Sequence, residues 1–154
     1  MGAEVTAVDS PIKETMLRQL GVDHYIDYTQ SDVTKQHKTY DIVFNMVANS
    51  RYAEYINLLN KNGRYLMGNP KLGDMLRALI TTKLSDKKAI FALAGETIEE
   101  LTTLSSMVEA GKIKSLVDKI YSMNNIVIAH QRVETEQRSG AVVLSFGVEI
   151  KTNN

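Results

Sequence analysis

Short β-rich segments that alternate with segments of helical periodicity constrain the fold of this chain more than any other feature of its sequence. Runs of roughly four to eight β-branched and aromatic residues are typical of strands, and apolar residues three and four apart are typical of helices. The predicted strands are residues 4–8, 24–28, 40–46, 64–68, 89–94, 114–121 and 141–146. Because helices separate most of them, the pattern predicts parallel βαβ units, and therefore an α/β fold with a doubly wound, mostly parallel sheet.

Capping residues mark where several helices begin and end. Ser10 followed by Pro11 is a favoured N-cap and first helical position, and Gly21 suits the turn after that helix. Thr97 and Glu100 have the spacing of a capping box. Further helices are predicted over residues 50–62, after residue 70, and over residues 124–138.

The composition limits the classes of partner. Lys plus Arg and Asp plus Glu both number 18, so we expect no general attraction to nucleic acid or to an acidic membrane. No apolar run approaches the roughly 20 residues of a membrane-spanning helix, and the acidic N-terminal sequence does not resemble a signal peptide. We therefore expect a cytoplasmic protein whose partners are neither nucleic acids nor membranes.

Few residues suggest chemistry within the chain itself. There is no cysteine, which excludes disulfides, thiolate zinc ligands and a cysteine nucleophile. The three histidines lack the spacing of metal ligands, and neither a Walker loop nor a G-x-S-x-G motif occurs. The sequence therefore assigns no metal site and no catalytic residue.

The predicted carboxyl ends of the strands are where such sheets bind ligands. Asp9 lies at one of these ends, where a carboxylate accepts the hydroxyls of an adenosine ribose or, alternatively, supports the dipole of the next helix. Lys13 follows one helical turn later, and it suits either a ribose 2′-phosphate or an exposed, solubilising role. Asn45 and Asn69 end two other strands and suit either a ligand amide or a simple turn. Gly68 allows a flat ring to approach the backbone.

Longer stretches of the sequence resemble a known family. The run GAEVTAVDSPIKETMLRQLGVDHYIDYTQSD resembles the second βαβ half of medium-chain dehydrogenases/reductases, in the quinone oxidoreductase-like branch. YDIVFNMV and LLNKNGRYLMGNP resemble the next two strands of that family and the helix between them. The pieces EAGKIKSLVDKIY, AHQRVE and SGAVVLSF resemble its C-terminal section. The resemblance covers residues 1–147.

This resemblance implies a Rossmann-like sheet without the family's first strand and glycine-rich turn, because no G-x-G-x-x-G occurs. It implies an incomplete dinucleotide-binding domain over residues 1–114 and, over residues 115–154, the end of the family's catalytic domain. NAD(P) is the implied cofactor, with NAD or NADP left open and binding expected to be weak. The implied cofactor-binding residues are Asp9 and Ser10 at the adenosine ribose, Lys13 and Tyr28 at a 2′-phosphate, and Asn45, Met46, Val47, Gly68 and Asn69 beside the nicotinamide.

The implied function is that of the nucleotide-binding portion of a zinc-independent, NAD(P)H-dependent reductase of quinones or alkenes, inactive as an isolated chain. A homo-oligomer is expected, because family members pair an outer strand, here residues 89–94, with its symmetry mate. Two alternatives stay open. One is a non-catalytic oligomerisation or interaction remnant. The other is a class I-like methyltransferase, which also uses an acidic residue after its second strand but ends in an antiparallel hairpin.

Overall fold

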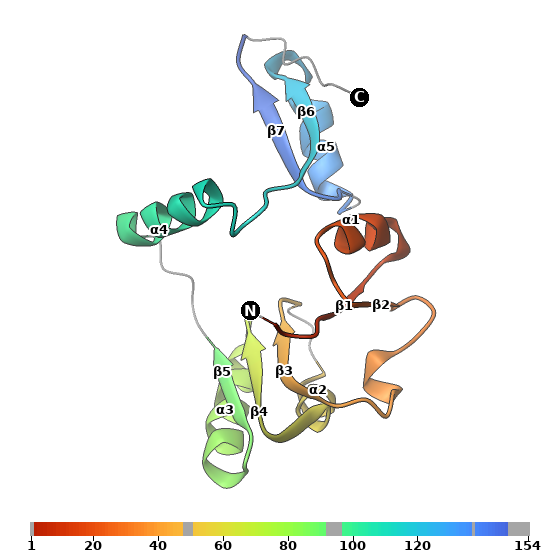
Figure 1. Cartoon of the computed structure of the whole chain (residues 1–154), viewed down its shortest axis with the longest axis vertical. Helices are drawn as coiled ribbons and strands as arrows, with labels where there is room; N and C mark the ends of the chain where they lie inside the picture. The colour runs from red at the N-terminus through yellow and green to blue at the C-terminus, as the bar shows by residue number, and fades with distance from the viewer. Residues whose placement is uncertain (1, 48–50, 92–96, 137, 148–154) are drawn as a thin grey trace. The chain divides into compact units, whose positions relative to one another are not determined.

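The computed structural model describes residues 2–47, 51–91, 97–136 and 138–147, and its chain forms two compact units (Figure 1). One unit contains Met1–Ser31 and Leu101–Asn154, and the other contains Asp32–Glu100. The domain boundary between residues 114 and 115 stays a prediction. None of the described helices is long and apolar enough to cross a membrane.

The N-terminal part of the first unit is a short βαβ arrangement. Its elements are β1 (Thr6–Asp9), a 3-10 turn (Pro11–Lys13), α1 (Glu14–Gln19) and β2 (His24–Asp27). The two strands are parallel, with Asp9 opposite Asp27 at their carboxyl ends. Pro11 begins the 3-10 turn, but the side chain of Ser10 makes no capping hydrogen bond. Gly21 has a φ of +86°, a conformation that favours glycine, in the turn after α1.

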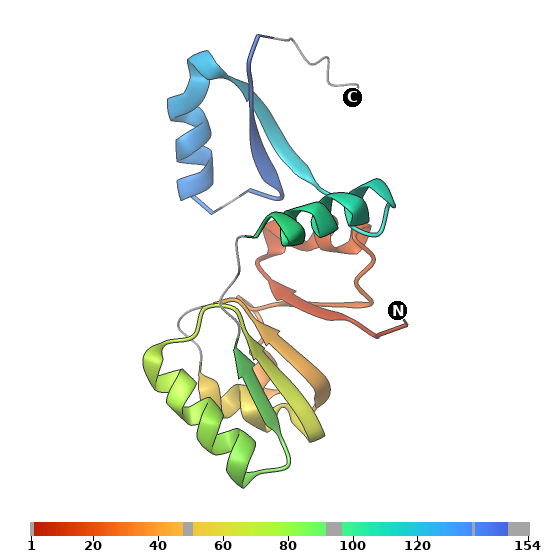
Figure 2. The same ribbon diagram turned by 90° about the vertical axis from the view of Figure 1, so that its left-hand side faces the viewer.

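The second unit is built on a three-stranded parallel sheet with the order β3-β4-β5. Its elements are a 3-10 turn (Val33–Lys35), β3 (Tyr40–Asn45), α2 (Tyr52–Asn57), β4 (Leu59–Met67), α3 (Leu72–Leu84) and β5 (Lys88–Phe91). The helices α2 and α3 lie against the same face of this sheet (Figure 2).

The core of the second unit lies between that face and the two helices. Tyr65 of β4 is fully buried, and its ring centroid lies 5.5 Å from that of Tyr52 and 5.8 Å from that of Tyr55. Ala78 and Ala89 complete the cluster from α3 and β5. Side chains alternate between the faces of a strand, so burying Tyr65 on one side turns Leu66 to the other.

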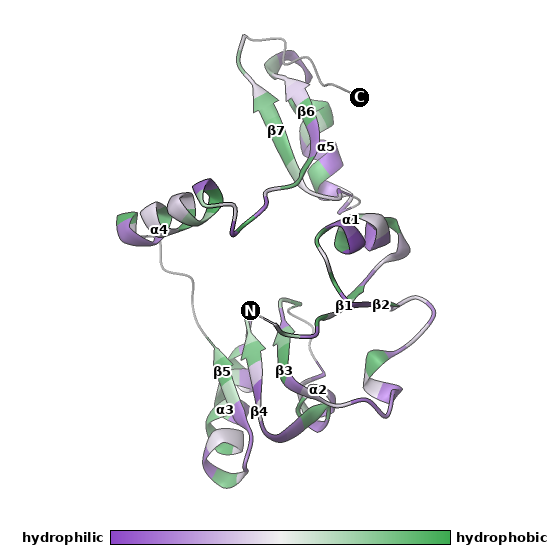
Figure 3. Ribbon diagram, in the orientation of Figure 1, coloured by the Kyte–Doolittle hydropathy of each residue, from purple (hydrophilic) through white to green (hydrophobic). Residues whose placement is uncertain are grey.

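The opposite face of this sheet carries a row of apolar side chains. Phe44, Leu66 and Ile90 lie side by side in the register of β3, β4 and β5. Phe44 is 65% exposed and Ile90 is 43% exposed. Hydropathic colouring marks apolar residues along these strands (Figure 3).

The prediction that the helix after residue 50 continues to residue 62 is wrong. Helix α2 ends at Asn57, and β4 begins at Leu59. The carbonyl of Leu58 accepts a hydrogen bond from the Tyr40 amide at 2.8 Å, and both Leu58 and Leu59 are buried. Burial and pairing with β3 therefore outweigh the helical periodicity. Ser50, where that helix is predicted to begin, and the predicted strand residues 92–94 lie outside the described residues.

The C-terminal part of the chain begins with a capped helix. Its elements are α4 (Ile98–Glu109), β6 (Val117–Ser122), a 3-10 turn (Met123–Asn125), α5 (Ile126–Glu134) and β7 (Ala141–Ser145). The capping box is confirmed: the Glu100 amide donates to Thr97 Oγ1 at 3.2 Å, and the Thr97 amide donates to Glu100 Oε2 at 3.0 Å. The Thr97 amide, and then the Thr97 hydroxyl that donates to the same Oε2 at 2.9 Å, lower the pKa of Glu100. The helix predicted over residues 124–138 is shorter, because Thr135 caps α5 and Glu136 has a φ of +54°.

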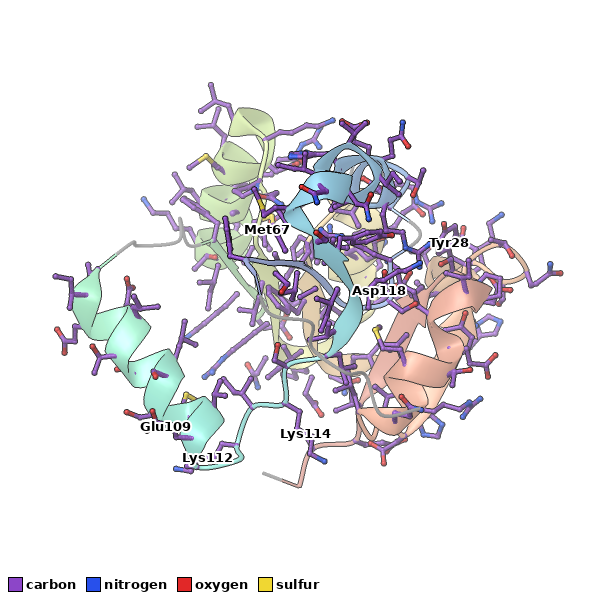
Figure 4. All side chains as sticks on the ribbon, turned by 90° about the horizontal axis from the view of Figure 1, so that it is seen from above. Tyr28, Met67, Glu109, Lys112, Lys114 and Asp118 are labelled. Carbon is purple, nitrogen blue, oxygen red and sulfur yellow. The ribbon has the colours of Figure 1, made fainter. Side chains whose placement is uncertain are left out.

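A partly buried ion pair joins α5 to β6. Arg132 donates two hydrogen bonds to the two carboxylate oxygens of Asp118, each 2.9 Å long, and the Ser139 amide donates a third at 3.0 Å. The Asp118 side chain, which Figure 4 labels on β6, is only 8% exposed. The Arg132 guanidinium and then the Ser139 amide lower the pKa of Asp118 to about 2.

Every strand pair in the described residues is parallel, which confirms the predicted α/β class. The pairing of β6 with β7 is also parallel, unlike the antiparallel hairpin that the methyltransferase alternative requires. Among the described strands, β1–β2 and β3–β4–β5 form separate sheets, so β1 and β3 each keep one edge without a neighbouring strand.

Candidate cofactor-binding site

Asp9 lies at the carboxyl end of β1, and its backbone carbonyl accepts two hydrogen bonds. Its carbonyl accepts the Tyr25 hydroxyl at 3.1 Å and the Tyr28 amide at 3.3 Å. Its Oδ1 accepts the Ser10 amide at 2.8 Å. Among the described residues, Oδ2 has no hydrogen-bond partner, so one carboxylate oxygen remains open to a hydroxyl group.

Lys13 lies beside this carboxylate. Its Nζ is 3.3 Å from Asp9 Oδ1, and the side chains of Lys13 and Asp9 are only 26% and 31% exposed. Asp9, predicted at the ribose hydroxyls, and Lys13, predicted at a 2′-phosphate, therefore form one ion pair. Tyr28, whose position Figure 4 labels, is 60% exposed and follows β2 directly. The four residues predicted at the adenosine ribose and 2′-phosphate thus lie together at the end of β1 and β2.

Tyr25 is a member of this group that sequence reasoning missed. Burial, followed by the nearby charges of Asp27, Glu14 and Asp9, raises the pKa of its phenol, which therefore stays a hydrogen-bond donor at neutral pH. Its bond to the Asp9 carbonyl depends on the register of β1 with β2, in which Tyr25 lies opposite Ala7. The sequence contains no direct signal for that register.

The turn after β3 is organised by Asn45. Its Oδ1 accepts the Val47 amide at 2.9 Å, while its Nδ2 donates to the Val47 carbonyl at 3.2 Å and to the Tyr65 hydroxyl at 3.1 Å. Asn45 is only 9% exposed, whereas Met46 and Val47 are 56% and 59% exposed. The amide of Asn45 therefore positions the turn, and the exposed surface of the turn belongs to the two residues that follow it.

The turn after β4 is tied to the turn after β3. The Gly68 amide donates to the Asn45 carbonyl at 3.0 Å, and Asn69 Nδ2 donates to the Met46 carbonyl at 3.1 Å. The thioether of Met46 occupies the space where a Cβ of residue 68 would lie. The structure therefore brings the five predicted nicotinamide-side residues together, but a ring approaching Gly68 first has to displace the flexible Met46 side chain.

Each group fits the chemistry of one end of a nicotinamide dinucleotide, and each lies within a single compact unit. The open Asp9 Oδ2 and the Lys13 ammonium can meet a ribose hydroxyl or phosphate, and the two linked turns can meet an amide. The sequence has no glycine-rich loop to hold the pyrophosphate. No cluster of three or more His, Cys, Asp or Glu side chains that could hold a metal occurs within the described ranges.

Comparison with known proteins gives a consistent result. The family model described as zinc-binding dehydrogenase matches residues 20–144. The mitochondrial NAD(P)H oxidoreductase RTN4IP1 of Danio rerio is 26% identical over 173 aligned residues, and that of Mus musculus is 28% identical over 169. Both alignments cover 94% of this chain but only 43% and 42% of the relatives. The chain therefore spans less than half the length of the curated relatives it matches.

Solved structures show the same partial correspondence. The quinone oxidoreductase from Coxiella burnetii superposes with a TM-score of 0.74 at 23% identity, covering 94% of this chain and 45% of that one. An NAD-dependent alcohol dehydrogenase gives a TM-score of 0.73 at 20% identity, covering 95% and 45%. At these identities the likeness concerns the fold, which is the Rossmann-like α/β fold predicted from the sequence.

Proposed function

Because this chain belongs to the zinc-binding dehydrogenase family, we propose that it is the nucleotide-binding portion of an NAD(P)H-dependent oxidoreductase that acts on quinones or activated alkenes. The observation that carries the proposal is the gathering of Asp9, Ser10, Lys13 and Tyr28 at the carboxyl ends of β1 and β2. The names of the RTN4IP1 relatives and of the quinone oxidoreductase structure support the proposed chemistry.

The residues of the chain would bind and orient such a cofactor. A nicotinamide dinucleotide, when bound, supplies the hydride. Asp9 accepts a ribose hydroxyl at Oδ2, while the Ser10 amide keeps the carboxylate turned toward the end of the strand. In the second unit, Asn45 and Asn69 fix the turns after β3 and β4, so the exposed residues Met46 and Val47 would be held beside the nicotinamide.

The isolated chain is proposed to bind the cofactor weakly and to lack turnover. A charge-assisted hydrogen bond contributes about 1.5–3 kcal/mol, so the loss of several phosphate contacts weakens affinity by orders of magnitude. Hydride transfer also requires the reacting atoms to be within about 3–3.5 Å, a geometry that needs a complete substrate cleft. We propose that the activity is independent of zinc, as the resemblance to the quinone oxidoreductase-like branch implies.

The test is to titrate the purified chain with NAD and NADP while following its amide resonances by NMR, and to assay NAD(P)H oxidation with a quinone. We expect millimolar dissociation constants, with shifts at Asp9, Ser10 and Tyr28, and no oxidation above the rate without protein. Micromolar binding would contradict the expected weakness and would require a phosphate site elsewhere. Resonance changes that avoid the ends of β1 and β2 would overturn the assignment of the site.

We also propose that the chain forms a homo-oligomer in the cytoplasm and has no nucleic-acid or membrane partner. Two features support self-association: the apolar row of Phe44, Leu66 and Ile90, in which Phe44 and Ile90 are exposed, and the edges of β1, β3 and β5 that have no neighbouring strand among the described residues. Exposed strand edges and apolar patches recruit partners. The same features favour the second candidate function, that of a non-catalytic oligomerisation module. A small-molecule substrate belongs to the proposal only for a longer protein that contains this portion.

A further inference from the structure

The sheet face of the second unit that α2 and α3 do not cover carries two rows of side chains with different chemistry. The apolar row consists of Phe44, Leu66 and Ile90, as described above. Two positions earlier in the same strands, and therefore on the same face, the register places a second row of Ile42, Arg64 and Lys88. Arg64 and Lys88 are exposed, and neither forms an ion pair within the described part of the chain. This open face is therefore apolar with a basic border.

Helix α4 carries an apolar surface of the kind that such a face would bind. One side of the helix forms an apolar stripe, whose members are three or four positions apart: Ile98, Leu101, Leu104 and Val108. All four are between 47% and 86% exposed, and no residue of α4 is buried within the described chain. Helices α3 and α5, in contrast, bury Ala78 and Ala129. The stripe of α4 therefore leaves an apolar surface exposed to solvent.

The charges of α4 are opposite to those of the open face. The helix has three glutamates and no lysine or arginine. At about 3.6 residues per turn, Glu100 and Glu109 border the apolar stripe on its two sides, whereas Glu99 lies on the opposite side of the helix. Figure 4 labels Glu109 at the end of α4. The apolar stripe with its acidic borders therefore complements the apolar row with its basic border.

We propose that two copies of the chain form a dimer by exchanging α4, so that the apolar stripe of each copy packs on the open face of the other copy. The inference rests on the homo-oligomer proposed above. The two surfaces have similar lengths: the row crosses three strands over about 10 Å, and Leu101 and Val108 lie about 10 Å apart along the helix. Because each copy supplies one stripe and one face, the exchange closes with two-fold symmetry and leaves neither surface open. A glutamate at the border of the stripe then lies beside Arg64 and Lys88.

Variants of the full chain that damage one surface each test the exchange. The helix variant carries Leu101→Gln and Leu104→Gln, and the face variant carries Phe44→Ser; amide NMR spectra check that both remain folded. We expect sedimentation equilibrium to give a dimer for the unmodified chain and a dissociation constant at least about tenfold higher for each variant. An equimolar mixture of the two variants should associate more tightly than either alone, because the intact helix of one meets the intact face of the other. No gain in the mixture would overturn the exchange.

A spin label on α4 identifies the contact directly. The chain has no cysteine, so Ser106→Cys, which lies off the apolar stripe, gives a single site for a nitroxide. Spin-labelled chain without nitrogen-15 is mixed with unmodified chain that carries nitrogen-15. We expect the amide resonances of Leu66 and Ile90 in the unmodified chain to broaden. If these resonances broaden instead in a spin-labelled nitrogen-15 chain diluted with excess unmodified chain, the exchange between copies is overturned.

Glu109→Gln and Glu99→Gln form a matched pair, since each removes one negative charge from α4 but only Glu109 borders the stripe. Glu109→Gln should weaken dimerisation about two- to threefold at low salt and less at high salt, and Glu99→Gln should leave it unchanged. Equal effects of the two replacements would overturn the charge complementarity on which the docking rests. A helix variant that dimerises as tightly as the unmodified chain would overturn the exchange and leave the homo-oligomer standing, whereas an unmodified chain that stays monomeric would overturn both.

Discussion

Replacing Arg132 by methionine should destabilise the β6–α5–β7 segment at neutral pH. The stability of the variant segment should also depend less on pH in the acid range. The guanidinium and the Ser139 amide hold the pKa of Asp118 at about 2, against an ordinary value of 3.8. At about 1.36 kcal/mol per pKa unit, this difference corresponds to roughly 2 kcal/mol. The Asp118 side chain is only 8% exposed, but the Arg132 side chain is 33% exposed, so solvent screening makes this figure an upper value.

The direction of the pH dependence follows from the lowered pKa. Because the folded state binds the Asp118 proton less tightly than the unfolded state, the stabilisation is fully present above about pH 4 to 5. It is lost as the pH falls through 3.8 toward about 2, where the folded carboxylate also becomes protonated. Arg132→Met removes the larger of the two favourable contacts, so the variant should unfold with a flatter dependence over this window.

Two measurements check this prediction. A carbon-13 NMR titration of the Asp118 carboxyl gives its pKa directly, and amide hydrogen exchange in β6 and β7 gives the local opening free energy. Arg138→Met is the control, because it removes an exposed arginine from the same part of the chain. Equal exchange rates in the two variants, or an Asp118 pKa near 3.8 in the unmodified chain, would refute the reasoning.

Three further outcomes are expected. Gly140→Ala should cost about 1–3 kcal/mol in urea unfolding, because its Cβ would lie 2.5 Å from the Leu116 carbonyl oxygen, and an unchanged midpoint would contradict this close packing. Thr97→Ala should cost about 0.5–2 kcal/mol and speed amide exchange in the first turn of α4, with the rest of the helix as internal reference. Phe44→Ser should lower the mass measured by light scattering, whereas Leu84→Ser, a change at an 82% exposed position, should not; equal masses would count against association through the sheet face.

Local signals in the sequence identified much of the fold. The Thr97–Glu100 capping box begins α4 as predicted, and the strand expected over residues 40–46 is β3 with a difference of one residue. The prediction failed at Leu58 and Leu59, whose helical spacing matches α2 but whose burial belongs to the sheet. Tertiary burial decided that boundary, and the local sequence around Leu58 does not show that β3 is its pairing partner.

The sequence predicted which residues form the candidate site, but not the hydrogen bonds and the ion pair that join them. Asp9 and Lys13 are four positions apart, a spacing that is compatible with an ion pair, yet their partnership depends on how the turn at Pro11 follows the strand. The role of Asn45 depends on the Tyr65 hydroxyl, twenty residues away in sequence. Hydrogen bonds between elements depend on register, and register is a property of the folded sheet.

The strand pairing described above has a consequence for how the chain folds. Each parallel pair joins neighbouring strands of the sequence: Thr6 pairs with His24, Leu66 with Ile90, and Ile120 with Val143. The entropic cost of closing a loop rises only slowly with its length, so each of these pairings has a modest closure cost. Because β1–β2, β3–β4–β5 and β6–β7 are separate sheets in the described residues, each can nucleate from its own stretch of chain. During synthesis, the β1–β2 pair could therefore form before the residues of β6 have been translated.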